Sequence, residues 1–383
     1  MKRVALYYPW IYVQSGVERS ILEIVRRSRH RYTIFTNHYD REQTFPDFAE
    51  IKDLVLLRRI AVQRSFSQTL KAVRTIYRQR LALDGFDALL VHSEGLGDFI
   101  TLRNHHQPVI CYCHSLVRPV YDSVYREALL RRKPRYRLPL ACLAPIYRLA
   151  TRVAWRHYAR VFVNSEETRR HVATARLCPS DQVEILHPGV ALERIRPSFG
   201  YERFFLHVGR IKWTKNIELA VRAFLEFKNT YARASEWKLV IAGDVDRHGH
   251  AYLDELRALS RSEPTIEFRM APSAVELDDL YNRCSALLFP AASEPWGIVP
   301  LEAMAYGKPV LAVNRGGPTE SVVDGETGFL LDPTPPVFAG KMAYLADHPE
   351  QVREMGRKAV ERASLYPWDH FVDRLDDYVE QHC

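Results

Sequence analysis

The feature of this sequence that most constrains its fold is a rhythm of short apolar runs alternating with helical patterns. In the first half, the runs predicted to be strands cover 3–8, 31–37, 53–57, 87–93, 108–114, 160–165 and 183–189. In the second half, they cover 204–209, 237–243, 266–270, 286–291, 309–313 and 327–331. Strands separated by amphipathic helices form parallel sheets with helices on both faces. Two such series predict an α/β protein of two doubly wound, Rossmann-like domains.

A segment rich in proline, glycine and charge, HPGVALERIRPSFGYER at 187–203, separates the two series of strands. The length of 383 residues exceeds one ordinary core and suits two domains. We therefore expect an N-terminal domain over 1–195 and a C-terminal domain over 196–365. The tail at 366–383 has apolar residues at helical spacing, and it need not belong to the domain before it.

The composition is that of a soluble globular protein, with 47% apolar and 26% charged residues. The N-terminus, MKRVALYYPW, lacks the apolar region and cleavage site of a signal peptide, and the longest apolar run, at 138–147, is about half a membrane span. The six cysteines show no C-x-x-C spacing, which indicates free thiols in a reducing compartment. These features predict a cytoplasmic protein.

Two acids lie eight positions apart in the stretch SEPWGIVPLEAMAYGKPVLAV, at 293–313. Proline fits a helix only in its first turn, so Pro300 predicts a helix that begins near Ile298. Glu294 then lies in the loop after a parallel strand, and Glu302 lies in the first turns of the helix. Ligands bind at the carboxyl ends of such strands, which makes this loop a candidate site.

The start of that helix suits a polar or phosphorylated ligand, because its first backbone amides have no partner within the helix. These amides belong to Gly297, Ile298 and Val299. The two flanking carboxylates are good acceptors for hydroxyl groups, which sugar and ribose rings offer in neighbouring pairs. The alternative is an acidic helix start that merely stabilises the helix dipole.

A second stretch, FFLHVGRIKWTKN, places Arg210 just beyond a strand and Lys215 at the start of the next helix. Two cations on the same sheet edge as an anion-binding helix can clamp a diphosphate. The alternative is a solvated basic loop. Gly16, which follows the first strand, opens the first helix and allows a phosphate or sugar near its backbone.

Taken together, these stretches resemble the retaining glycosyltransferases of family 4, which have the GT-B fold. The resemblance covers nearly the whole chain and is strongest from 204 to 335. Two further segments match, AGD at 242–244 and GGPTESVVDGETGFLL at 316–331. In chain order, the matching motifs are the G-x-E-R of Gly16, Glu18 and Arg19, the GR…K of Gly209, Arg210 and Lys215, and the E-x7-E of Glu294 and Glu302.

The resemblance implies that a nucleotide-diphosphate sugar lies in a cleft between the domains, held mostly by the C-terminal one. Arg210 and Lys215 would neutralise the diphosphate leaving group, next to Gly209. Glu302 would bind the ribose hydroxyls, and Glu294 would bind the hydroxyls of the donor sugar. Backbone amides would assist Glu294, namely those of Gly297, Ile298 and Val299.

The resemblance also assigns parts of the N-terminal domain. His114, at the end of CYCHS, is similar to the family's active-site histidine, which faces the donor sugar; taken alone it would be a buried structural histidine. Gly16 would lie near the donor, although Ser15 stands where the family usually has another glycine. The last helix of a GT-B protein crosses back to the first domain, which implies the same for 366–383.

No metal or cofactor is expected, because cations and helix dipoles would stabilise the departing diphosphate. The sequence DVD at 244–246 matches a D-x-D metal motif of the other glycosyltransferase fold, but here it follows LVIAG as a family 4 loop. The resemblance favours a front-face reaction, in which the departing phosphate accepts the proton of the acceptor. Met270 stands where a glycine is usual, which bears on the nucleobase pocket.

The positive charge of the chain is concentrated in one segment. Ten basic residues and one acid lie in 126–160, a net charge of +9, whereas the whole chain carries +8. Apolar residues occur among these arginines, a pattern that indicates a helix on an anionic membrane surface. The alternative is a solvated helical face. No nucleic-acid recognition module is present, so we expect no nucleic-acid partner. The basic amphipathic segment predicts a peripheral protein on the inner face of the cell membrane.

The stretches YCHS…R…YD at 112–122 and GIVPLEAMAYGKPVLAVNRGGP at 297–318 look most like mannosyltransferases of lipid-linked oligosaccharide and bacterial polysaccharide assembly. This favours GDP-mannose over UDP-sugars as donor and a lipid-linked or surface glycan as acceptor. One alternative is a nucleotide-sugar epimerase on a similar scaffold, which should lack the GR…K and E-x7-E pairing. Another is a non-catalytic subunit, which should have lost some of the candidate catalytic residues. All of these are present, namely His114, Arg210, Lys215 and Glu294.

Overall fold

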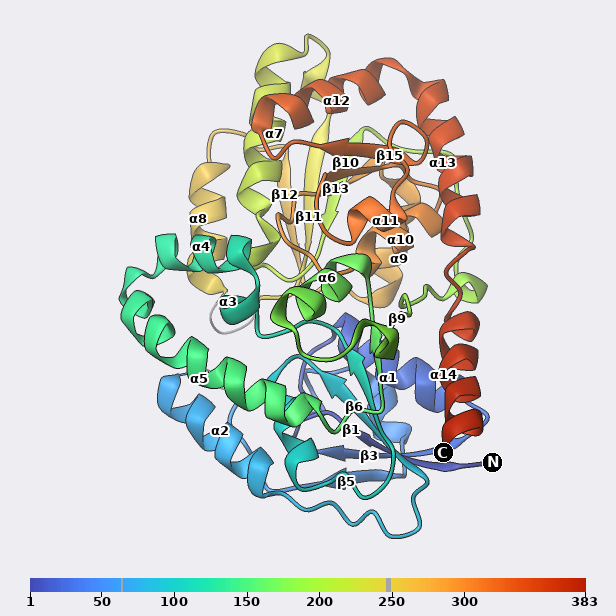
Figure 1. Cartoon of the computed structure of the whole chain (residues 1–383). Helices are drawn as coiled ribbons and strands as arrows, with labels where there is room; N and C mark the ends of the chain where they lie inside the picture. The colour runs from blue at the N-terminus through green and yellow to red at the C-terminus, as the bar shows by residue number, and fades with distance from the viewer. Residues whose placement is uncertain (63–64, 246–248) are drawn as a thin grey trace. The chain divides into compact units, whose positions relative to one another are not determined.

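The computed structural model describes residues 1–62, 65–245 and 249–383 (Figure 1). The chain divides into two compact units. The first unit comprises Met1–Pro188 together with Trp368–Cys383, and the second comprises Gly189–Pro367. The division after residue 188 falls inside the segment rich in proline and glycine, somewhat before the boundary expected after residue 195. Each unit is described below by itself.

The first unit is built on a parallel sheet of seven strands in the order β5-β3-β1-β6-β7-β8-β9. The strands are β1 (Arg3–Tyr7), β3 (Arg31–Thr36), β5 (Leu54–Leu56), β6 (Ala88–Ser93), β7 (Val109–Cys113), β8 (Arg160–Val163) and β9 (Val183–Ile185). A separate parallel pair joins β2 (Trp10–Ile11) to β4 (His38–Tyr39). The sequence did not predict this pair, because two residues are too few to show a strand pattern.

The helices of the first unit pack on both faces of this sheet. They are α1 (Gly16–Arg27), α2 (Phe66–Arg78), α3 (Arg118–Tyr121), α4 (Ser123–Arg132), α5 (Arg137–Trp155), α6 (Glu166–Ala175) and α14 (Trp368–His382). Short 3₁₀ turns are η1 (Pro46–Glu50), η2 (Leu96–Leu102), η3 (Pro134–Tyr136) and η4 (Ser180–Gln182). Strands buried on both faces read as continuous apolar runs, which is why the central strands, such as β6 and β7, were visible in the sequence.

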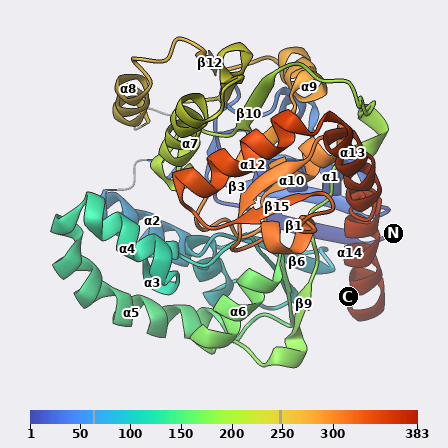
Figure 2. The same ribbon diagram turned by 90° about the horizontal axis from the view of Figure 1, so that it is seen from above.

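The C-terminal helix α14 belongs to the first unit, where it lies beside α1 (Figures 1 and 2). Its buried Asp376 accepts hydrogen bonds from the hydroxyl of Ser28 at 2.7 Å and from the backbone amide of Arg29 at 2.9 Å. Phe371 packs edge-on against Tyr112 of β7, with ring centroids 5.0 Å apart. A buried carboxylate is stable only when it is hydrogen-bonded, so these contacts fix both the position and the register of the helix.

The second unit holds a parallel sheet of six strands in the order β12-β11-β10-β13-β14-β15. The strands are β10 (Phe204–Val208), β11 (Lys238–Gly243), β12 (Ile266–Met270), β13 (Ala286–Phe289), β14 (Val310–Val313) and β15 (Gly328–Leu331). Together with the first sheet, they include every strand that the apolar runs predicted. The prediction of two parallel-sheet α/β domains is therefore confirmed.

Helices cover both faces of the second sheet and bury one apolar cluster on each. They are α7 (Ile217–Thr230), α8 (His250–Leu259), α9 (Ala274–Arg283), α10 (Ile298–Ala305), α11 (Pro318–Ser321), α12 (Pro335–Asp347) and α13 (Pro349–Ala363). Short turns are η5 (Leu192–Arg194), η6 (Trp213–Lys215) and η7 (Ala234–Glu236). The first cluster lies under α7, α8 and α12, and the second lies under α9 and α10. Helices α7 and α12 lie side by side in both views (Figures 1 and 2).

Within the described parts of the chain, no helix combines the length and the apolar character needed to cross a bilayer. All six cysteines are free thiols, as the sequence predicted.

Candidate functional site

The candidate site of the second unit lies at the carboxyl ends of β10 and β13. These strands are neighbours in the sheet, with Phe205 opposite Ala286 in the parallel register. Arg210 follows β10, and the loop that carries Glu294 follows β13. The two loops therefore emerge side by side at the edge where parallel sheets bind ligands.

Lys215 and Glu294 form the central contact of this edge. The ammonium nitrogen of Lys215 lies 2.7 Å from Oε2 of Glu294, and each side chain is 19% exposed. The next residue, Asn216, has a left-handed backbone with φ of 52°, and its side-chain amide donates a hydrogen bond to the carbonyl of Pro290 at 3.0 Å. Asn216 thus joins the two loops. The sequence analysis missed it, although asparagine is one of the few side chains that favour this backbone conformation.

Helix α10 begins at Ile298, which confirms the prediction drawn from Pro300. Its N-cap is Gly297, with φ of +88°, and no side chain caps the helix in the described structure. A Cβ on Gly297 would lie 3.1 Å from the ring of Phe289 and 3.4 Å from Cγ of Glu294. A helix start without a capping side chain leaves the amides of its first turn, including that of Val299, to another acceptor.

Two consecutive glycines hold the Glu294 loop in place. The amide of Gly317 donates to the carbonyl of Glu294 at 2.9 Å. A Cβ on Gly317 would lie 2.0 Å from the carbonyl oxygen of Trp296, and one on Gly316, where φ is +70°, would lie 2.4 Å from that of Glu294. The sequence analysis matched this GGP segment to the family without giving it a role. Paired glycines after a predicted strand are the signal for such a close backbone approach.

The loops after β10 and β11 approach each other just as closely. A Cβ on Gly243 would lie 1.9 Å from the carbonyl oxygen of Gly209, so the backbone at 209 is fixed immediately before the partly buried Arg210. The amide of Ile211 donates to the carbonyl of Asp244 at 2.8 Å. Asp244 therefore supports the Arg210 loop through its backbone, whereas the second acid of the DVD motif, at 246, lies outside the described residues.

Glu302 lies in α10 beneath the same edge, where Tyr281 orients it. The phenol of Tyr281 donates to Oε2 of Glu302 at 2.9 Å. Burial, followed by the nearby charge of Glu302, raises the pKa of Tyr281 well above its usual value, so the phenol remains a donor at neutral pH. Tyr281 also stacks on Tyr306, with centroids 5.1 Å apart. This aromatic support for Glu302 was not predicted from the sequence.

His114 lies in the first unit, directly after β7, and is 7% exposed. Its Nε2 is 2.9 Å from Nδ1 of His92, the buried histidine of the neighbouring strand β6. Burial lowers the pKa of His114 to about 4 and the pKa of His92 well below its usual value. Both rings are therefore neutral at pH 7, and one donates to the other. His92 was missed, although it stands near the end of the adjacent predicted strand.

Gly16 is the first residue of α1, and a Cβ placed on it would meet nothing within 4 Å. The preceding Ser15 caps this helix, because its hydroxyl accepts from the amide of Val17 at 3.2 Å and also contacts the carboxylate of Glu18. The serine that departs from the family pattern thus satisfies one of the amides at the start of the helix.

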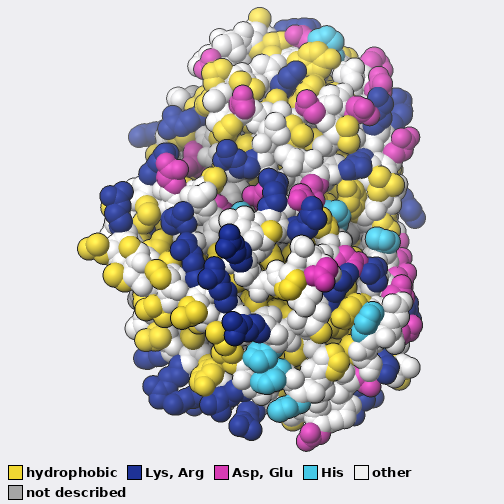
Figure 3. Space-filling view, viewed as in Figure 1, with side chains coloured by type: hydrophobic (Ala, Val, Ile, Leu, Met, Phe, Trp, Pro, Cys, Tyr) yellow, Lys and Arg dark blue, Asp and Glu magenta, His cyan; other side chains and the backbone are white. Residues whose placement is uncertain are grey.

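The basic segment 126–160 spans most of α4, the turn η3, and α5. Helix α5 buries one narrow face and exposes an apolar stripe at helical spacing. The exposed fractions in this stripe are 77% for Leu138, 65% for Ile146, 66% for Leu149 and 41% for Val153. Figure 3 shows hydrophobic and basic side chains gathered together over α4 and α5. A helix normally buries its large apolar side chains, so this stripe is a candidate interaction surface.

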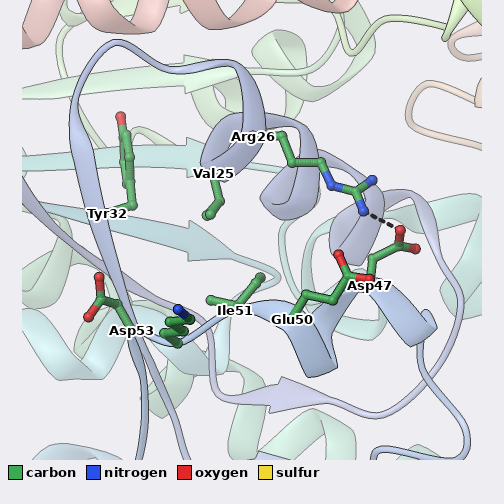
Figure 4. Close-up of a pocket in the computed structure, with 8 residues that line it drawn as sticks. Val25, Arg26, Tyr32, Asp47, Glu50, Ile51 and Asp53 are labelled. Atoms are coloured by element: carbon green, nitrogen blue, oxygen red, sulfur yellow. Dashed lines mark hydrogen bonds and ion pairs between the residues drawn. The ribbon is translucent and has the colours of Figure 1, made fainter.

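A further pocket, drawn in Figure 4, lies at the opposite edge of the first sheet. Tyr32 lies near the start of β3, and Asp53 immediately precedes β5, so the pocket is at the amino ends of these strands. The ion pair of Arg26 with Asp47 borders it. Ligands of doubly wound sheets bind at carboxyl ends, so this pocket does not compete with the site described above.

Two models of known protein families match this chain. The model for glycosyl transferases group 1 matches residues 192–362, and the model for glycosyltransferase family 4 matches residues 14–194. Among relatives, alpha-1,3/1,6-mannosyltransferase ALG2 of Mus musculus is 29% identical over 293 residues, which cover 73% of this chain and 69% of that protein. The protein of the same name from Dictyostelium discoideum is 31% identical over 47% of this chain and 46% of its own length.

A D-inositol 3-phosphate glycosyltransferase of Acidothermus cellulolyticus is also similar, with 30% identity over 56% of this chain and 52% of that protein. Among solved structures, Anabaena HepE in complex with UDP and glucose superposes with a TM-score of 0.72 and 15% identity over the full length of both chains. Sucrose-phosphate synthase of Thermosynechococcus elongatus has a TM-score of 0.76 and 18% identity, over 100% of this chain and 99% of that one. At such low identity, these likenesses establish the fold.

Proposed function

Because this chain belongs to the family 4 glycosyltransferases and has their GT-B fold, we propose that it transfers mannose from GDP-mannose to a lipid-linked glycan. The relatives that support mannose are the alpha-1,3/1,6-mannosyltransferases of mouse and Dictyostelium. The observation that carries the proposal is the contact of Lys215 with Glu294 at the carboxyl edge of the second sheet. It joins a cation suited to phosphate and a carboxylate suited to hydroxyl groups.

In this proposal, the second unit holds the donor. Arg210 and Lys215 bind the diphosphate, beside the close backbone approach at Gly209. Glu302, oriented by Tyr281, accepts hydrogen bonds from the ribose hydroxyls. Glu294 accepts from the sugar hydroxyls, and the uncapped amides at Gly297, Ile298 and Val299 donate to the sugar or the phosphate.

The reaction breaks the bond between the anomeric carbon and the diphosphate oxygen. The electron pair leaves with the nucleoside diphosphate, whose growing charge Arg210 and Lys215 stabilise without a metal or other cofactor. The acceptor hydroxyl attacks from the same face, its proton passes to the departing phosphate oxygen, and the configuration is retained. Because Lys215 is already held by Glu294, little reorganisation precedes the reaction.

The first unit contributes His114 and the start of α1. His92 holds a neutral His114, whose other ring nitrogen is left for a ligand, and the open space at Gly16 admits a ligand close to the backbone. Because burial keeps the pair neutral at pH 7, it offers hydrogen bonds rather than charge.

The acceptor arrives from an anionic membrane surface on the inner face of the cell membrane, to which α5 attaches the protein. Its exposed stripe supplies apolar area, and basic residues flank the stripe. The flanking residues include Arg131, Arg132, Lys133, Arg135 and Arg137. Apolar burial combined with attraction to acidic headgroups is the mode by which amphipathic basic helices bind membranes.

A donor panel tests the proposal. The purified protein is incubated with GDP-mannose, UDP-glucose, UDP-GlcNAc or UDP-galactose, and thermal shift and slow hydrolysis of the sugar nucleotide are measured. We expect GDP-mannose to give the largest shift and the fastest hydrolysis in the wild type and neither effect in Lys215→Ala. Stabilisation by a UDP-sugar alone would overturn the choice of donor, and no response to any donor would overturn the proposed function.

A further inference from the structure

A second pocket of the first unit lies between the carboxyl end of β5 and α2, and its lining is basic. Among the described residues that line it, the cations are Arg58, Arg59, Lys71, Arg74 and Arg78, and none is acidic. Figure 3 shows Lys and Arg side chains gathered over α2. Because the pocket lies at the carboxyl edge of a parallel sheet, it is at the edge where such sheets bind ligands.

The backbone that carries the two arginines after β5 is fixed to the sheet. The carbonyl of Arg58 accepts from the side-chain amide of Asn37 at 2.8 Å, and the carbonyl of Ala61 accepts from the indole of Trp10 at 3.3 Å. The amide of Leu57 donates to the carbonyl of Thr36 at 2.8 Å. The backbone of this wall is therefore fixed, while the side chains of Arg58 and Arg59 are exposed to solvent.

The cations of α2 repeat at helical spacing, at Lys71, Arg74 and Arg78, so they lie on one face of the helix. Like charges at this spacing destabilise a helix. None of the five cations forms an ion pair with a carboxylate in the described residues, whereas Arg27 and Arg29 of the same unit pair with acids of α14. The pocket therefore holds five cations without a carboxylate partner among the described residues, which suits the binding of an external anion.

We propose that this pocket binds a phosphate or diphosphate group, and, resting on the proposed function, that the acceptor of the mannosyl group carries it. Arginine forks bind phosphate oxygens in pairs, and several arginines around one pocket suit a diphosphate better than a single carboxylate. Gln68 and Thr75, which also line the pocket, add neutral hydrogen-bonding groups. The group can belong to a membrane-lipid headgroup or to the glycan-carrying molecule.

The test uses inorganic pyrophosphate and calorimetric titration of the full-length protein. The Lys215→Ala background weakens the other proposed phosphate site, because it removes one of the two cations assigned to the diphosphate there. In this background, we expect one pyrophosphate site, and we expect the additional changes Arg58→Gln and Arg74→Gln to weaken it by about tenfold or more, since each removes a charged hydrogen bond. The matched control is Arg222→Gln, an exposed arginine of α7. Equal binding with and without the pocket arginines would overturn the proposal, as would binding only above about 10 mM.

A second readout is independent of the heat of binding. Burial and, after it, the charge of Arg59 lower the pKa of His38. Pyrophosphate in the pocket should neutralise that charge and raise the pKa of His38, measured by NMR titration. The variant Arg58→Gln, Arg74→Gln should also melt at a higher temperature than its parent in low salt without anion, because like-charge repulsion is relieved. An unchanged His38 titration on adding pyrophosphate would contradict occupancy of the pocket.

Vesicles distinguish the two sources of the phosphate. If phosphatidylglycerol vesicles, but not phosphatidylcholine vesicles, displace pyrophosphate from the Lys215→Ala protein, the pocket holds a lipid headgroup, and the assignment of its phosphate to the mannosyl acceptor is overturned. If neither displaces it, the phosphate belongs to the glycan-carrying molecule; either result supports the site. Failure of this proposal can be distinguished from failure of the proposed function. If only this proposal fails, the pocket variants still bind GDP-mannose, and they also bind pyrophosphate as their parent does. If the proposed function fails, the wild type itself does not bind GDP-mannose.

Discussion

The carboxyl edges of the two sheets are built on different principles. In the second unit, the loops interlock through backbone contacts at Gly243 and Gly317, and the cation Lys215 is paired with Glu294. In the first unit, the same edge carries a buried neutral histidine pair and a group of cations without carboxylate partners among the described residues, and α5 exposes an apolar stripe along its length. In the second unit, Lys215 has its partner within the chain, whereas the amides at the start of α10 have no capping side chain. The first unit presents cations without carboxylate partners among the described residues and exposed apolar area, both of which suit a partner.

The largest effect is expected for Lys215→Ala. The change removes a cation that we propose stabilises the departing diphosphate, so kcat should fall by about 10²–10³-fold. Stability should fall by less than about 2 kcal/mol, because only one partly exposed ion pair is lost. Turnover and urea unfolding measure the two effects. The control is Lys358→Ala, a lysine whose side chain is 44% exposed and lies 3.6 Å from Glu354. Comparable losses of turnover and stability would make Lys215 a structural residue.

The second prediction compares a glycine from each edge. Gly317→Ala should destabilise the second unit by about 3 kcal/mol, because its Cβ would lie 2.0 Å from the carbonyl oxygen of Trp296. Gly16→Ala should leave stability within about 0.5 kcal/mol, since its Cβ meets nothing within 4 Å. Denaturant unfolding of both variants checks the difference. Equal costs would show that the edges do not differ in backbone packing.

These two edges also show what the sequence could predict. The apolar runs located every strand of both sheets, and Pro300 located the start of α10, because both signals are local. The family motifs singled out the residues of the second edge, such as Lys215, but they said nothing of the direct contact with Glu294.

What the sequence missed depends on contacts between distant segments. His92 meets His114 only because β6 and β7 are neighbours in the sheet. The pocket cations come from two segments that each look like a solvated basic stretch. Tyr281 reaches Glu302 from another helix. Periodicity contains no information about such pairings, so these groups became visible only in the fold.

The third prediction concerns the apolar stripe. The double change Ile146→Glu, Leu149→Glu should weaken binding to phosphatidylglycerol vesicles by about tenfold or more, because it removes apolar contact and adds repulsion from acidic headgroups. Folding should be unaffected, since these side chains are 65% and 66% exposed. Vesicle flotation measures binding. Val275→Glu on α9, where the valine is 78% exposed, is the matched control. If the double variant floats as the wild type does, α5 is a solvated helix.

The fourth prediction uses pH to separate the two units. When folding lowers the pKa of a histidine below its unfolded value of about 6.5, the unfolded state binds the proton more tightly. The free energy of unfolding therefore falls as the pH drops from about 6.5 towards the folded pKa. Burial lowers the pKa of both His92 and His114 in the first unit, and it lowers the pKa of His207 to about 4 in the second. Between pH 7 and 5, the first unit should lose more stability, by on the order of 1–2 kcal/mol. Hydrogen exchange of each sheet measures this loss.

The control for that experiment is His92→Gln, which removes one titrating ring of the pair and can still hydrogen-bond to His114. It should reduce the acid sensitivity of the first sheet and leave that of the second sheet unchanged. The same pH dependence in this variant and in the wild type would show that the histidine pair does not set it.

The smallest effect is expected for Tyr281→Phe. The change removes one hydrogen bond to Glu302 but keeps the ring that stacks on Tyr306. KM for the donor should rise by about fivefold, which corresponds to about 1 kcal/mol, with little change in kcat, because the proposed contact of Glu302 with the ribose would be equally strong in the ground and transition states. Steady-state kinetics separate the two constants. A larger loss in kcat than in KM would place Glu302 nearer the reacting bond.

The central claim is that the second unit holds the donor through its own carboxyl edge. A crystal structure of the protein with GDP tests it most directly. Our account predicts the diphosphate against Arg210 and Lys215 and the ribose hydroxyls on Glu302. Nucleotide bound elsewhere, or bound with its phosphates away from both cations, would contradict it.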